Sequence, residues 1–313
     1  MLTAMTEPTE SRRERAARRA GEFPPAPEPL PLPVLDSHTH LDITVTESGT
    51  PGAPAPVPPG APGPVPVPPC GDPVNRLIEV AAAAGVDRLV QVGTDVESSR
   101  WGAEAATRYP AVLATVALHP NDAPRLPDLD AALREIEALA GQDRVRGIGE
   151  TGLDFFRTGD EGRAAQEESF RAHIAIAKRF DKALVIHDRD AHADVLRVLD
   201  SEGAPATVVL HCFSGDEEFA AECVRRGYVL SFAGTVTFGN AGGLRAAAKV
   251  TPLDQLLVET DAPYLTPTPY RGRPNASYLI PLTVRTLAET TGADLDELCA
   301  AISATGNRIF GPW

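Results

Sequence analysis

The sequence predicts an α/β protein folded as a TIM-type (β/α)8 barrel. Eight short runs of β-branched or aliphatic residues alternate with amphipathic stretches of roughly ten to eighteen residues. Because strands that are each followed by a helix form a parallel sheet, eight such units favour closure into a barrel. The alternative is an open doubly wound sheet, but no GxGxxG motif follows the first run. The barrel is therefore the preferred prediction.

The predicted strands are the apolar runs, taken in chain order. They are PVLDSH (33–38), RLVQVG (88–93), VLATVAL (112–118), VRGIGE (145–150), ALVIH (183–187), TVVLH (207–211), YVLSF (228–232) and LLVET (256–260). The predicted helices carry apolar residues at i, i+3, i+4 and i+7. They include residues 74–85, 99–109, 128–140, 164–180, 191–203, 217–227 and 241–250. Gly85, Gly203 and Gly227 stand where helix C-caps are expected.

Two low-complexity segments interrupt this alternation. Residues 1–33 join an Arg/Glu-rich opening to EFPPAPEPLPLP, and we expect a disordered N-terminal arm because proline removes backbone donors and favours extended chain. Residues 46–71 are a second proline-rich segment, interpreted as a loop insert that forms neither helix nor sheet. The insert follows the first strand, so it either flanks the barrel mouth or is a solvated excursion. Residues 34–313 make up one barrel domain.

Composition excludes several classes of function. The chain has 313 residues, 43% of them hydrophobic, enough for one large core. No window approaches about eighteen apolar residues, and no apolar segment follows the N-terminal charges, so neither a membrane span nor secretion is expected. Four widely spaced cysteines without a CxxC pair fit the cytoplasm. The net charge of −14 disfavours non-specific coating of duplex DNA, although metal ions in a site supply local positive charge.

Polar residues end most of the predicted strands, on the rim where TIM barrels carry their active sites. A single histidine there is usually half-buried and bonded to backbone, but five of the seven histidines fall at such ends. The other two, His173 and His192, are expected on helix surfaces or loops. His38 and His40 point to the same face of a strand, so both can enter one coordination sphere. The strand-end residues are His38, His40, His119, Glu150, His187, His211 and Asp261.

Imidazole and carboxylate without thiolate favour a divalent ion such as Mg²⁺, Mn²⁺ or Zn²⁺. Six candidate ligands exceed the roughly three of an open catalytic zinc and suit two metal ions joined by a bridging carboxylate, for which Glu150 is expected. Asp261 is the expected general base for a metal-activated water, its alternative role being an Asx-turn or helix N-cap. The six candidate ligands are His38, His40, Glu150, His187, His211 and Asp261.

Five motifs in chain order resemble a known family. LDSHTHLD, GIGETGLDFF, VIHDRDA, VLHCFSGD and ETDAPYLTP, over residues 34–270, closely resemble the TatD family of metal-dependent deoxyribonucleases within the amidohydrolase-like barrels. The resemblance continues to ATGNRIFG and omits only the insert. It implies a TIM-type barrel, a divalent metal centre and hydrolysis of DNA phosphodiester bonds, typically as a 3′ exonuclease. All six metal ligands named above lie at positions that match the family's motifs.

Further residues are candidates for contact with substrate. Arg189 and Arg271 are expected either to bind a phosphate, which a guanidinium does bidentately, or to form surface salt bridges. His119, in ALHPND, matches a family position near the pocket, where it contacts substrate or caps its loop. Asp154 is expected to orient a ligand histidine, and Cys212 to be a packed thiol rather than a nucleophile.

Three functional hypotheses remain at this point. The leading one is a metal-dependent phosphodiesterase of single-stranded or terminal DNA, acting as a 3′ exodeoxyribonuclease. The alternative is hydrolysis of an ester or amide, since the same activated water attacks carbonyl carbons and some TatD relatives are D-aminoacyl-tRNA deacylases. A metal-poor scaffold is the third, opposed by the complete ligand set. DNA is the expected partner, with no membrane and no obligate protein partner.

Overall fold

The computed structural model describes residues 21–51 and 71–313, and its core is an eight-stranded parallel sheet in the order β1 to β8. All eight predicted strands are confirmed. Their bounds are β1 Val34–Thr39, β2 Val86–Val92, β3 Val112–Val116, β4 Val145–Asp154, β5 Ala183–Arg189, β6 Val208–Leu210, β7 Val229–Phe232 and β8 Leu256–Val258. The sheet closes between its first and last strands, where Thr39 pairs in parallel with Ala262. The predicted TIM-type barrel is therefore the observed fold.

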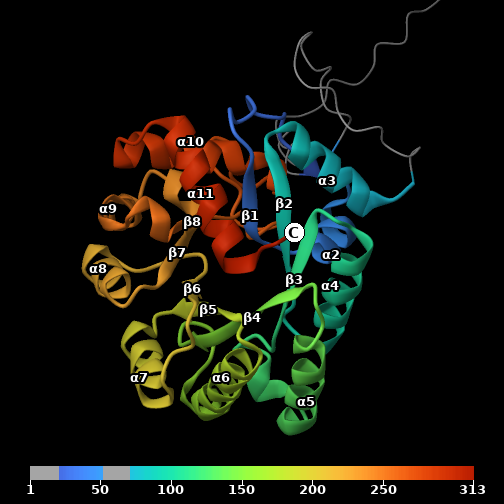
Figure 1. Cartoon of the computed structure of the whole chain (residues 1–313), viewed down its shortest axis with the longest axis vertical. Coiled ribbons are helices and arrows are strands. Elements are labelled where there is room, and N and C mark those ends of the chain that lie inside the picture. The colour runs from blue at the N-terminus through green and yellow to red at the C-terminus, as the bar shows by residue number, and fades with distance from the viewer. Residues whose placement is uncertain (1–20, 52–70) are drawn as a thin grey trace, which may run out of the picture.

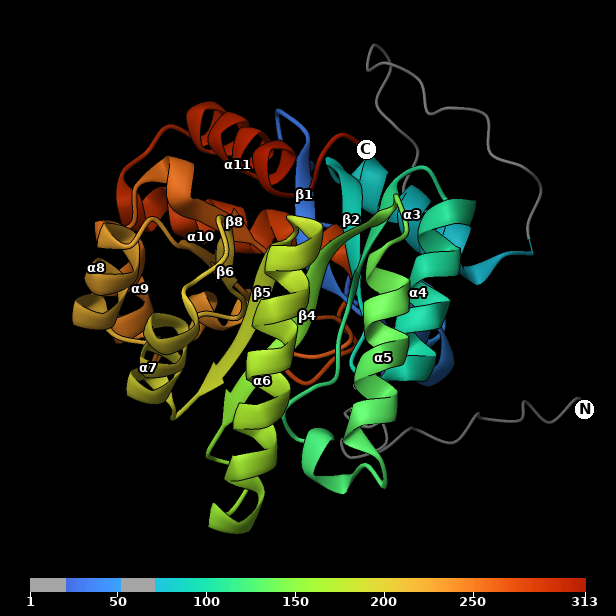
Figure 2. The same ribbon diagram turned by 60° about the horizontal axis from the view of Figure 1, so that its bottom comes forward.

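Nine long helices in the described part of the chain surround the strands (Figures 1 and 2). They are α3 Pro73–Ala83, α4 Val96–Arg108, α5 Leu129–Ala140, α6 Asp160–Phe180, α7 His192–Glu202, α8 Glu217–Arg225, α9 Gly242–Val250, α10 Ile280–Thr291 and α11 Leu295–Phe310. Helices α3, α4, α5, α8 and α11 each begin after an aspartate whose side chain accepts a backbone N–H of the first turn, which satisfies a donor that the helix leaves free.

Short helical turns occupy several of the connections. They are α2 Leu41–Ile43, the π-helical η1 Thr44–Ser48, and the 3₁₀ turns η2 Ala123–Arg125, η3 Gly234–Thr237, η4 Leu253–Gln255 and η5 Ser277–Leu279. The first of the 3₁₀ turns follows β3, and η3 follows β7. These turns shape the loops around the strand ends, where the polar residues lie.

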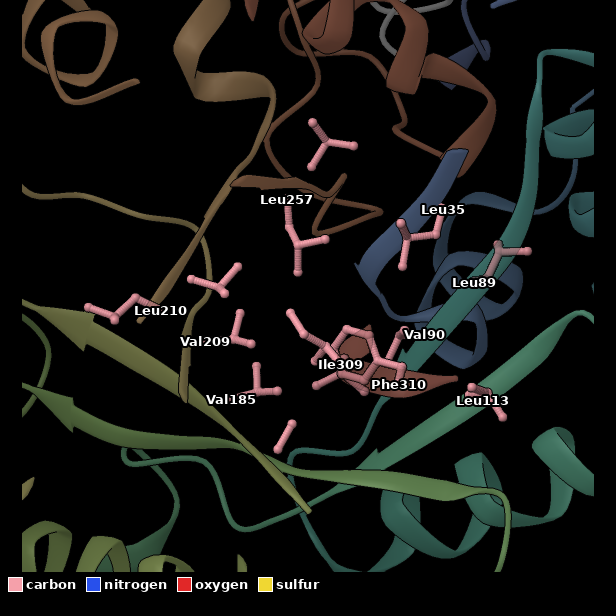
Figure 3. Packing of buried hydrophobic residues seen from close by; sticks show 14 of the residues in the cluster. Leu35, Leu89, Val90, Leu113, Val185, Val209, Leu210, Leu257, Ile309 and Phe310 are labelled. Carbon is pink, nitrogen blue, oxygen red and sulfur yellow. The ribbon is translucent and has the colours of Figure 1, made fainter. Parts of the chain in front are cut away.

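The core lies inside the barrel and is closed at the N-terminal ends of the strands by α11. Figure 3 shows Ile309 and Phe310, from the end of this helix, among the side chains of the strands. A Cβ built at Gly306 of α11 would overlap the side chain of Leu35 in β1. Glycine at this position therefore permits the close approach of α11 to the sheet, leaving the opposite end of the barrel free for a site.

The N-terminal arm is shorter than expected. Residues 22–33 form neither helix nor strand but are held against the barrel: Leu30 is buried and its N–H donates to the Ala84 carbonyl over 3.1 Å, while the Tyr278 hydroxyl donates to the Pro24 carbonyl over 2.5 Å. The expectation of disorder to residue 33 was wrong here, because prolines without donors still offer carbonyl acceptors to neighbouring side chains. Residues 1–20 of the predicted arm lie outside the described residues.

The loop insert also begins later than expected. Residues 46–48 belong to the π-helical turn η1, so the prediction that residues 46–71 contain no helix was wrong at its first residues. The Thr44 hydroxyl donates to the His40 carbonyl, and the Thr46 hydroxyl donates to the Asp42 carbonyl, which stabilises this turn. Residues 52–70 of the insert lie outside the described residues. In the part of the chain that is described, no helix has the length and apolar character needed to cross a membrane.

Candidate metal centre

The six predicted metal ligands meet at the C-terminal end of the barrel. In the described chain, groups of possible ligand atoms that lie within 4.8 Å of one another are His38 with His40 and Asp261, His38 with His211 and Glu259, and His119 with Glu150 and His187. All six expected ligands are among these residues. His38, Glu150 and His187 lie on β1, β4 and β5. His40 and His211 directly follow β1 and β6, and Asp261 lies in the loop after β8.

His38 and His40 converge on one carboxylate, as their spacing predicts. Their Nε2 atoms lie 3.7 and 3.4 Å from Oδ1 of Asp261. Nδ1 of His40 lies 3.0 Å from the Val92 carbonyl, which can only accept a hydrogen bond, so in the neutral ring Nδ1 carries the proton. Nε2 then presents its lone pair to the centre, the arrangement typical of metal-bound histidine.

Glu150 stands between two sets of imidazoles. Its Oε2 lies 3.5 Å from Nε2 of His38, while its Oε1 lies 2.6 Å from Nδ1 of His187 and 2.8 Å from Nε2 of His211. The two oxygens of one carboxylate thus face different histidines. This placement is what a bridging ligand between two cations requires.

Two acidic residues hold the outer nitrogens of the histidines. Oδ2 of Asp154 lies 3.2 Å from Nε2 of His187, as predicted for a residue that orients a ligand. Oε1 of Glu259 lies 3.2 Å from Nδ1 of His211 and also accepts the Cys212 N–H over 2.8 Å. Glu259 was not predicted, although it directly follows the apolar residues of the last predicted strand; its position at a strand end was the available signal.

The local backbone explains how Glu150 reaches the centre. The pairing of β4 with β5 is irregular between Ile148 and Thr151, so the strand bulges where Glu150 stands. Gly149 and Gly152 flank the bulge with φ of +156° and +141°, and a Cβ at either would overlap backbone atoms of β5. The motif GIGETGLD therefore places glycine where only glycine fits and turns the carboxylate inward.

Charge at the centre is balanced between acids and imidazoles. Burial opposes ionisation of Glu150, but the charges of His211 and His119 and the hydrogen bonds from His119 and His187 outweigh it and hold the pKa well below its usual value. For Asp261, burial is likewise outweighed, by the close contact with the His40 side chain and the charges of the surrounding histidines, and the pKa is lowered. Both carboxylates are ionised at neutral pH and can hold cations.

His38 tests whether the residues fit a metal ion. Its ring is completely buried, and both of its nitrogens lack a hydrogen-bond partner in the described structure. Burial, followed by the charge of His211, lowers the pKa of His38, so the ring is neutral and keeps a lone pair. A buried polar atom without a partner is costly, and a cation supplies the missing interaction. The donor set of imidazoles and carboxylates suits the divalent ions expected from the sequence.

His119 differs from the six expected ligands. Its Nδ1 accepts the Asn121 N–H over 3.0 Å, so in the neutral ring the proton is on Nε2, which lies 3.3 Å from Oε1 of Glu150. That nitrogen is a hydrogen-bond donor rather than a lone pair directed at a metal ion. This geometry agrees with the expectation of a substrate contact, with the backbone bond also holding the loop.

The two arginines lie on the rim rather than among the ligands. Arg189 is exposed at the end of β5, with its guanidinium carbon 4.3 Å from the centre of the Phe156 ring. Arg271 is exposed in the loop after β8, 4.0 Å from the centre of the Phe238 ring. It lines a cavity of about 570 Å³ that includes none of the six ligands but does include Tyr264, whose ring centre lies 6.4 Å from that of His40. Among the described residues, neither arginine forms a salt bridge, which was the alternative role expected from the sequence.

Comparison with known proteins places this arrangement in a family. The model for TatD related DNases matches residues 35–311, nearly the whole barrel. The chain belongs to the TatD family. One TatD-family relative, an uncharacterised metal-dependent hydrolase of Mycobacterium tuberculosis, is 48% identical over 244 residues, which cover 77% of this chain and 92% of that protein. A 3′-5′ ssDNA/RNA exonuclease TatD of Cronobacter sakazakii is 38% identical over 243 residues, covering 75% and 91%.

Solved TatD structures share the fold. The crystal structure of a TatD homologue from Escherichia coli K12 superposes with a TM-score of 0.75 at 25% identity and covers 88% of this chain and 98% of that one. A TatD-family hydrolase of Entamoeba histolytica has a TM-score of 0.74 at 16% identity, which supports the fold alone. This protein is thus a TatD-family metal-dependent hydrolase, and the centre described above is at the position where its barrel carries chemistry.

One residue of the TatD motif LDSHTH has a structural role that the sequence did not reveal. Asp36 is completely buried, and its carboxylate accepts hydrogen bonds from the N–H and hydroxyl of Thr260 and from the His38 N–H. Burial raises the pKa of Asp36 to about 7, although these hydrogen bonds oppose the shift. Asp36 therefore ties β1 to the segment after β8 and fixes the two strand ends that carry His38 and Asp261.

Proposed function

We propose that this protein is a divalent-metal-dependent exonuclease that removes nucleotides from the 3′ end of single-stranded DNA. The observation that carries the proposal is the position of Glu150, whose two oxygens face separate groups of imidazoles. The 38% identical relative from Cronobacter sakazakii is a 3′-5′ ssDNA/RNA exonuclease, which supports the same substrate class. In this proposal the two exposed arginines, Arg189 and Arg271, receive phosphates of the strand.

We assign the six ligands to two ions. His38, His40 and Asp261 would hold one ion, His187 and His211 would hold the other, and Glu150 would be shared between them. Such a pair of ions, when bound, activates a water molecule and stabilises charge on a phosphodiester. Mg²⁺, Mn²⁺ and Zn²⁺ all suit this mixture of nitrogen and oxygen donors.

Three side chains of the protein have separate roles at the centre: one accepts a proton, one donates a hydrogen bond and one orients a ligand. Asp261 is ionised and is the most accessible of the carboxylates at the centre, with 17% of its side chain exposed, so it accepts the proton of the attacking water. The Nε2–H of His119 points toward the same centre and donates a hydrogen bond to a phosphate oxygen. Asp154 keeps its pKa low through hydrogen bonds from His187, two backbone N–H groups and Asn121, against the effect of burial, and fixes the His187 ring.

The cellular setting follows from the composition. The cysteines in the described chain, Cys212, Cys223 and Cys299, are free thiols, and we infer a cytoplasmic enzyme. The net charge of −14 repels long duplexes, so the substrate is engaged at an end and at the metal centre.

The test is a substrate panel with defined metals and the Asp261→Asn variant. Purified protein loaded with Mg²⁺, Mn²⁺ or Zn²⁺ is given 5′-labelled single-stranded DNA, RNA, blunt duplex and D-aminoacyl-tRNA. We expect stepwise shortening of single-stranded DNA from its 3′ end, and a loss of about 10²-fold or more in kcat for Asp261→Asn, because its amide cannot accept the proton. Metal content measured in the same samples separates loss of the base from loss of an ion.

The outcomes distinguish the hypotheses. Full activity of Asp261→Asn shows that Asp261 is not the base. Rapid release of the D-amino acid with intact DNA identifies an aminoacyl ester as the substrate and ends the exonuclease proposal. Metal content below one ion per chain after reconstitution supports a scaffold instead of an enzyme.

A further inference from the structure

Large apolar side chains are rarely exposed in this barrel. Among the described residues, the large hydrophobic side chains that are exposed are Leu32 at 39%, Phe156 at 62% and Tyr264 at 47%. Leu32 precedes β1 at the closed end of the barrel. Phe156 follows β4 and Tyr264 follows β8, so both of the exposed aromatic rings stand at the rim that carries the metal centre. Aromatic rings exposed at a functional rim indicate a ligand with a flat apolar face.

Phe156 is connected directly to the centre. Its N–H donates over 3.0 Å to Oδ1 of Asp154, the carboxylate whose other oxygen faces His187. The Phe155 N–H donates to the Arg189 carbonyl over 2.9 Å, and the Arg189 guanidinium lies over the Phe156 ring. The Asp154 carboxylate therefore fixes both a metal ligand and the loop that presents the Phe156 ring. The positive charge of Arg189 lies beside this ring.

Tyr264 stands on the other side of the same centre. Its ring centre is 6.4 Å from that of His40, and its N–H donates to the Asp261 carbonyl over 2.9 Å. It also lines the cavity of about 570 Å³, together with Phe238 and Arg271. In a barrel whose strands run in order, β4 and β8 are opposite one another. The two exposed rings thus flank the metal centre from opposite strands.

Charge around the rings favours a polyanion. Arg157 and Arg189 are exposed beside Phe156, and Arg271 is exposed on the side of Tyr264, although the chain as a whole is acidic. The exposed Glu47 lines the same cavity as Tyr264 and Arg271, so the positive charge of the rim is confined to the three arginines. Arginine next to an exposed aromatic ring is the combination that binds single-stranded nucleic acid, where bases stack and phosphates pair.

We propose that Phe156 and Tyr264 are stacking surfaces for nucleobases of a single strand whose phosphate lies at the metal centre between them. This inference rests on the proposed function and adds to it how the bases of the strand are bound. A protein partner would have to cover the metal centre, and a duplex offers only the outer face of its terminal pair for stacking, whereas two separate rings on opposite sides of the centre suit unpaired bases. The occupant is therefore an unpaired strand, and stacking gives binding without a preference for particular bases.

The experiment measures binding rather than turnover. A 5′-fluorescent oligonucleotide with phosphorothioate linkages, which resist hydrolysis, is titrated with the full chain loaded with Mn²⁺ and followed by fluorescence anisotropy. A second oligonucleotide carries abasic residues at its three 3′-terminal positions. The variants are Phe156→Ala, Tyr264→Ala, the conservative Phe156→Trp, and Leu32→Ala, which removes an exposed apolar side chain away from the rim.

We expect Phe156→Ala and Tyr264→Ala each to raise Kd for the normal oligonucleotide by about 5- to 100-fold, with little change for the abasic one. Phe156→Trp keeps the wild-type Kd, and Leu32→Ala matches the wild type on both oligonucleotides. Thermal unfolding of each variant shows whether it remains folded.

Equal Kd values of the wild type for the two oligonucleotides, equal losses on both for the alanine variants, or no binding at all overturn the stacking proposal. Base-dependent binding without hydrolysis of any nucleic acid overturns the nuclease instead and leaves the stacking surfaces in place. Cleavage of DNA without base-dependent binding supports the nuclease and overturns the stacking proposal.

Discussion

At the scale of single residues, the outer partner of each histidine determines what its inner nitrogen can do. The Val92 carbonyl leaves the His40 lone pair facing the centre, whereas the Asn121 N–H leaves a proton there on His119. Two histidines at the same rim are therefore suited to different tasks. Residue type alone did not separate them, since the distinction depends on backbone groups far away in the sequence.

Glu259→Gln tests the role of the unpredicted carboxylate. Its Oε1 lies 3.2 Å from Nδ1 of His211, and the amide loses the charge that fixes this ring. We expect metal affinity to fall by about 10- to 100-fold while the fold is kept. Competition with a metallochromic dye measures the affinity, and Glu222→Gln on the surface of α8 is the matched control. An unchanged affinity would show that Glu259 serves only to hold the Cys212 backbone.

His173 corrects another expectation. It was expected on a helix surface, but it is completely buried in α6, where its Nδ1 donates to the Ser169 carbonyl and its Nε2 accepts the Leu118 N–H. It thereby holds the segment that carries His119. The helical periodicity around His173 did not reveal that its face lies against β4 and the segment after β3 rather than solvent.

Burial lowers the pKa of His173 to about 4, which predicts a pH effect. Because the folded protein binds this proton less readily than the unfolded chain, the stabilisation is complete above about pH 6.5 and is lost as pH falls toward 4, by up to roughly 3 kcal/mol. His173→Leu has no such dependence and costs about 1–3 kcal/mol at pH 7.5, where the Leu118 N–H is left without an acceptor. Urea unfolding measures the free energy of unfolding of the wild type and of His173→Leu. The difference between these two values should narrow from pH 7.5 to 4.5, and a constant difference would contradict the lowered pKa of His173.

At the scale of elements, the positions of the strands were predicted from their composition, but their irregularities were not. The runs of β-branched residues identified all eight strands, and the bulge in β4 that aims Glu150 came only with the structure. The prolines of residues 22–33 indicated disorder, yet that segment is bound through carbonyls to Arg273 and Tyr278. Composition shows how many backbone N–H donors a segment has. Whether its carbonyl acceptors form hydrogen bonds depends on the side chains that pack against it.

Gly152→Ala tests the close contact of β4 with β5. The new Cβ would overlap the His187 carbonyl at a φ of +141°, so we expect a loss of about 2 kcal/mol or more in the free energy of unfolding, with weaker metal binding. Gly239→Ala is the control, because a Cβ there has nothing within 4 Å. Urea unfolding of both variants is the measurement, and equal stabilities would mean that the strands separate without cost.

At the scale of the whole molecule, the centre joins parts of the chain that are remote in sequence. Ligands from the first and last strands meet where the sheet closes, through Asp36 and Thr260. Occupation of the centre by metal ions must therefore stabilise the complete barrel, because the unfolded chain cannot offer the same arrangement.

Metal removal provides the corresponding prediction. With Mn²⁺ at about 100 times its dissociation constant, the free energy of unfolding should rise by about 2.7 kcal/mol and Tm by about 4 °C relative to the protein with EDTA. Glu150→Ala should lose most of this increase, because the remaining ligands lose their shared carboxylate. Differential scanning calorimetry measures both proteins, and an identical increase in the variant would exclude Glu150 as a ligand.

The sequence by itself determined the eight-stranded barrel, the TatD-like motifs and the set of strand-end acids and histidines. These depend on local periodicity and on the rule that parallel strands end on one rim. The tertiary structure decided which nitrogen of each histidine faces inward, that Glu259 and Asp36 support the centre, and that Phe156 and Tyr264 stand exposed on opposite sides of it. Those properties belong to contacts between distant segments, and no local pattern encodes such a contact.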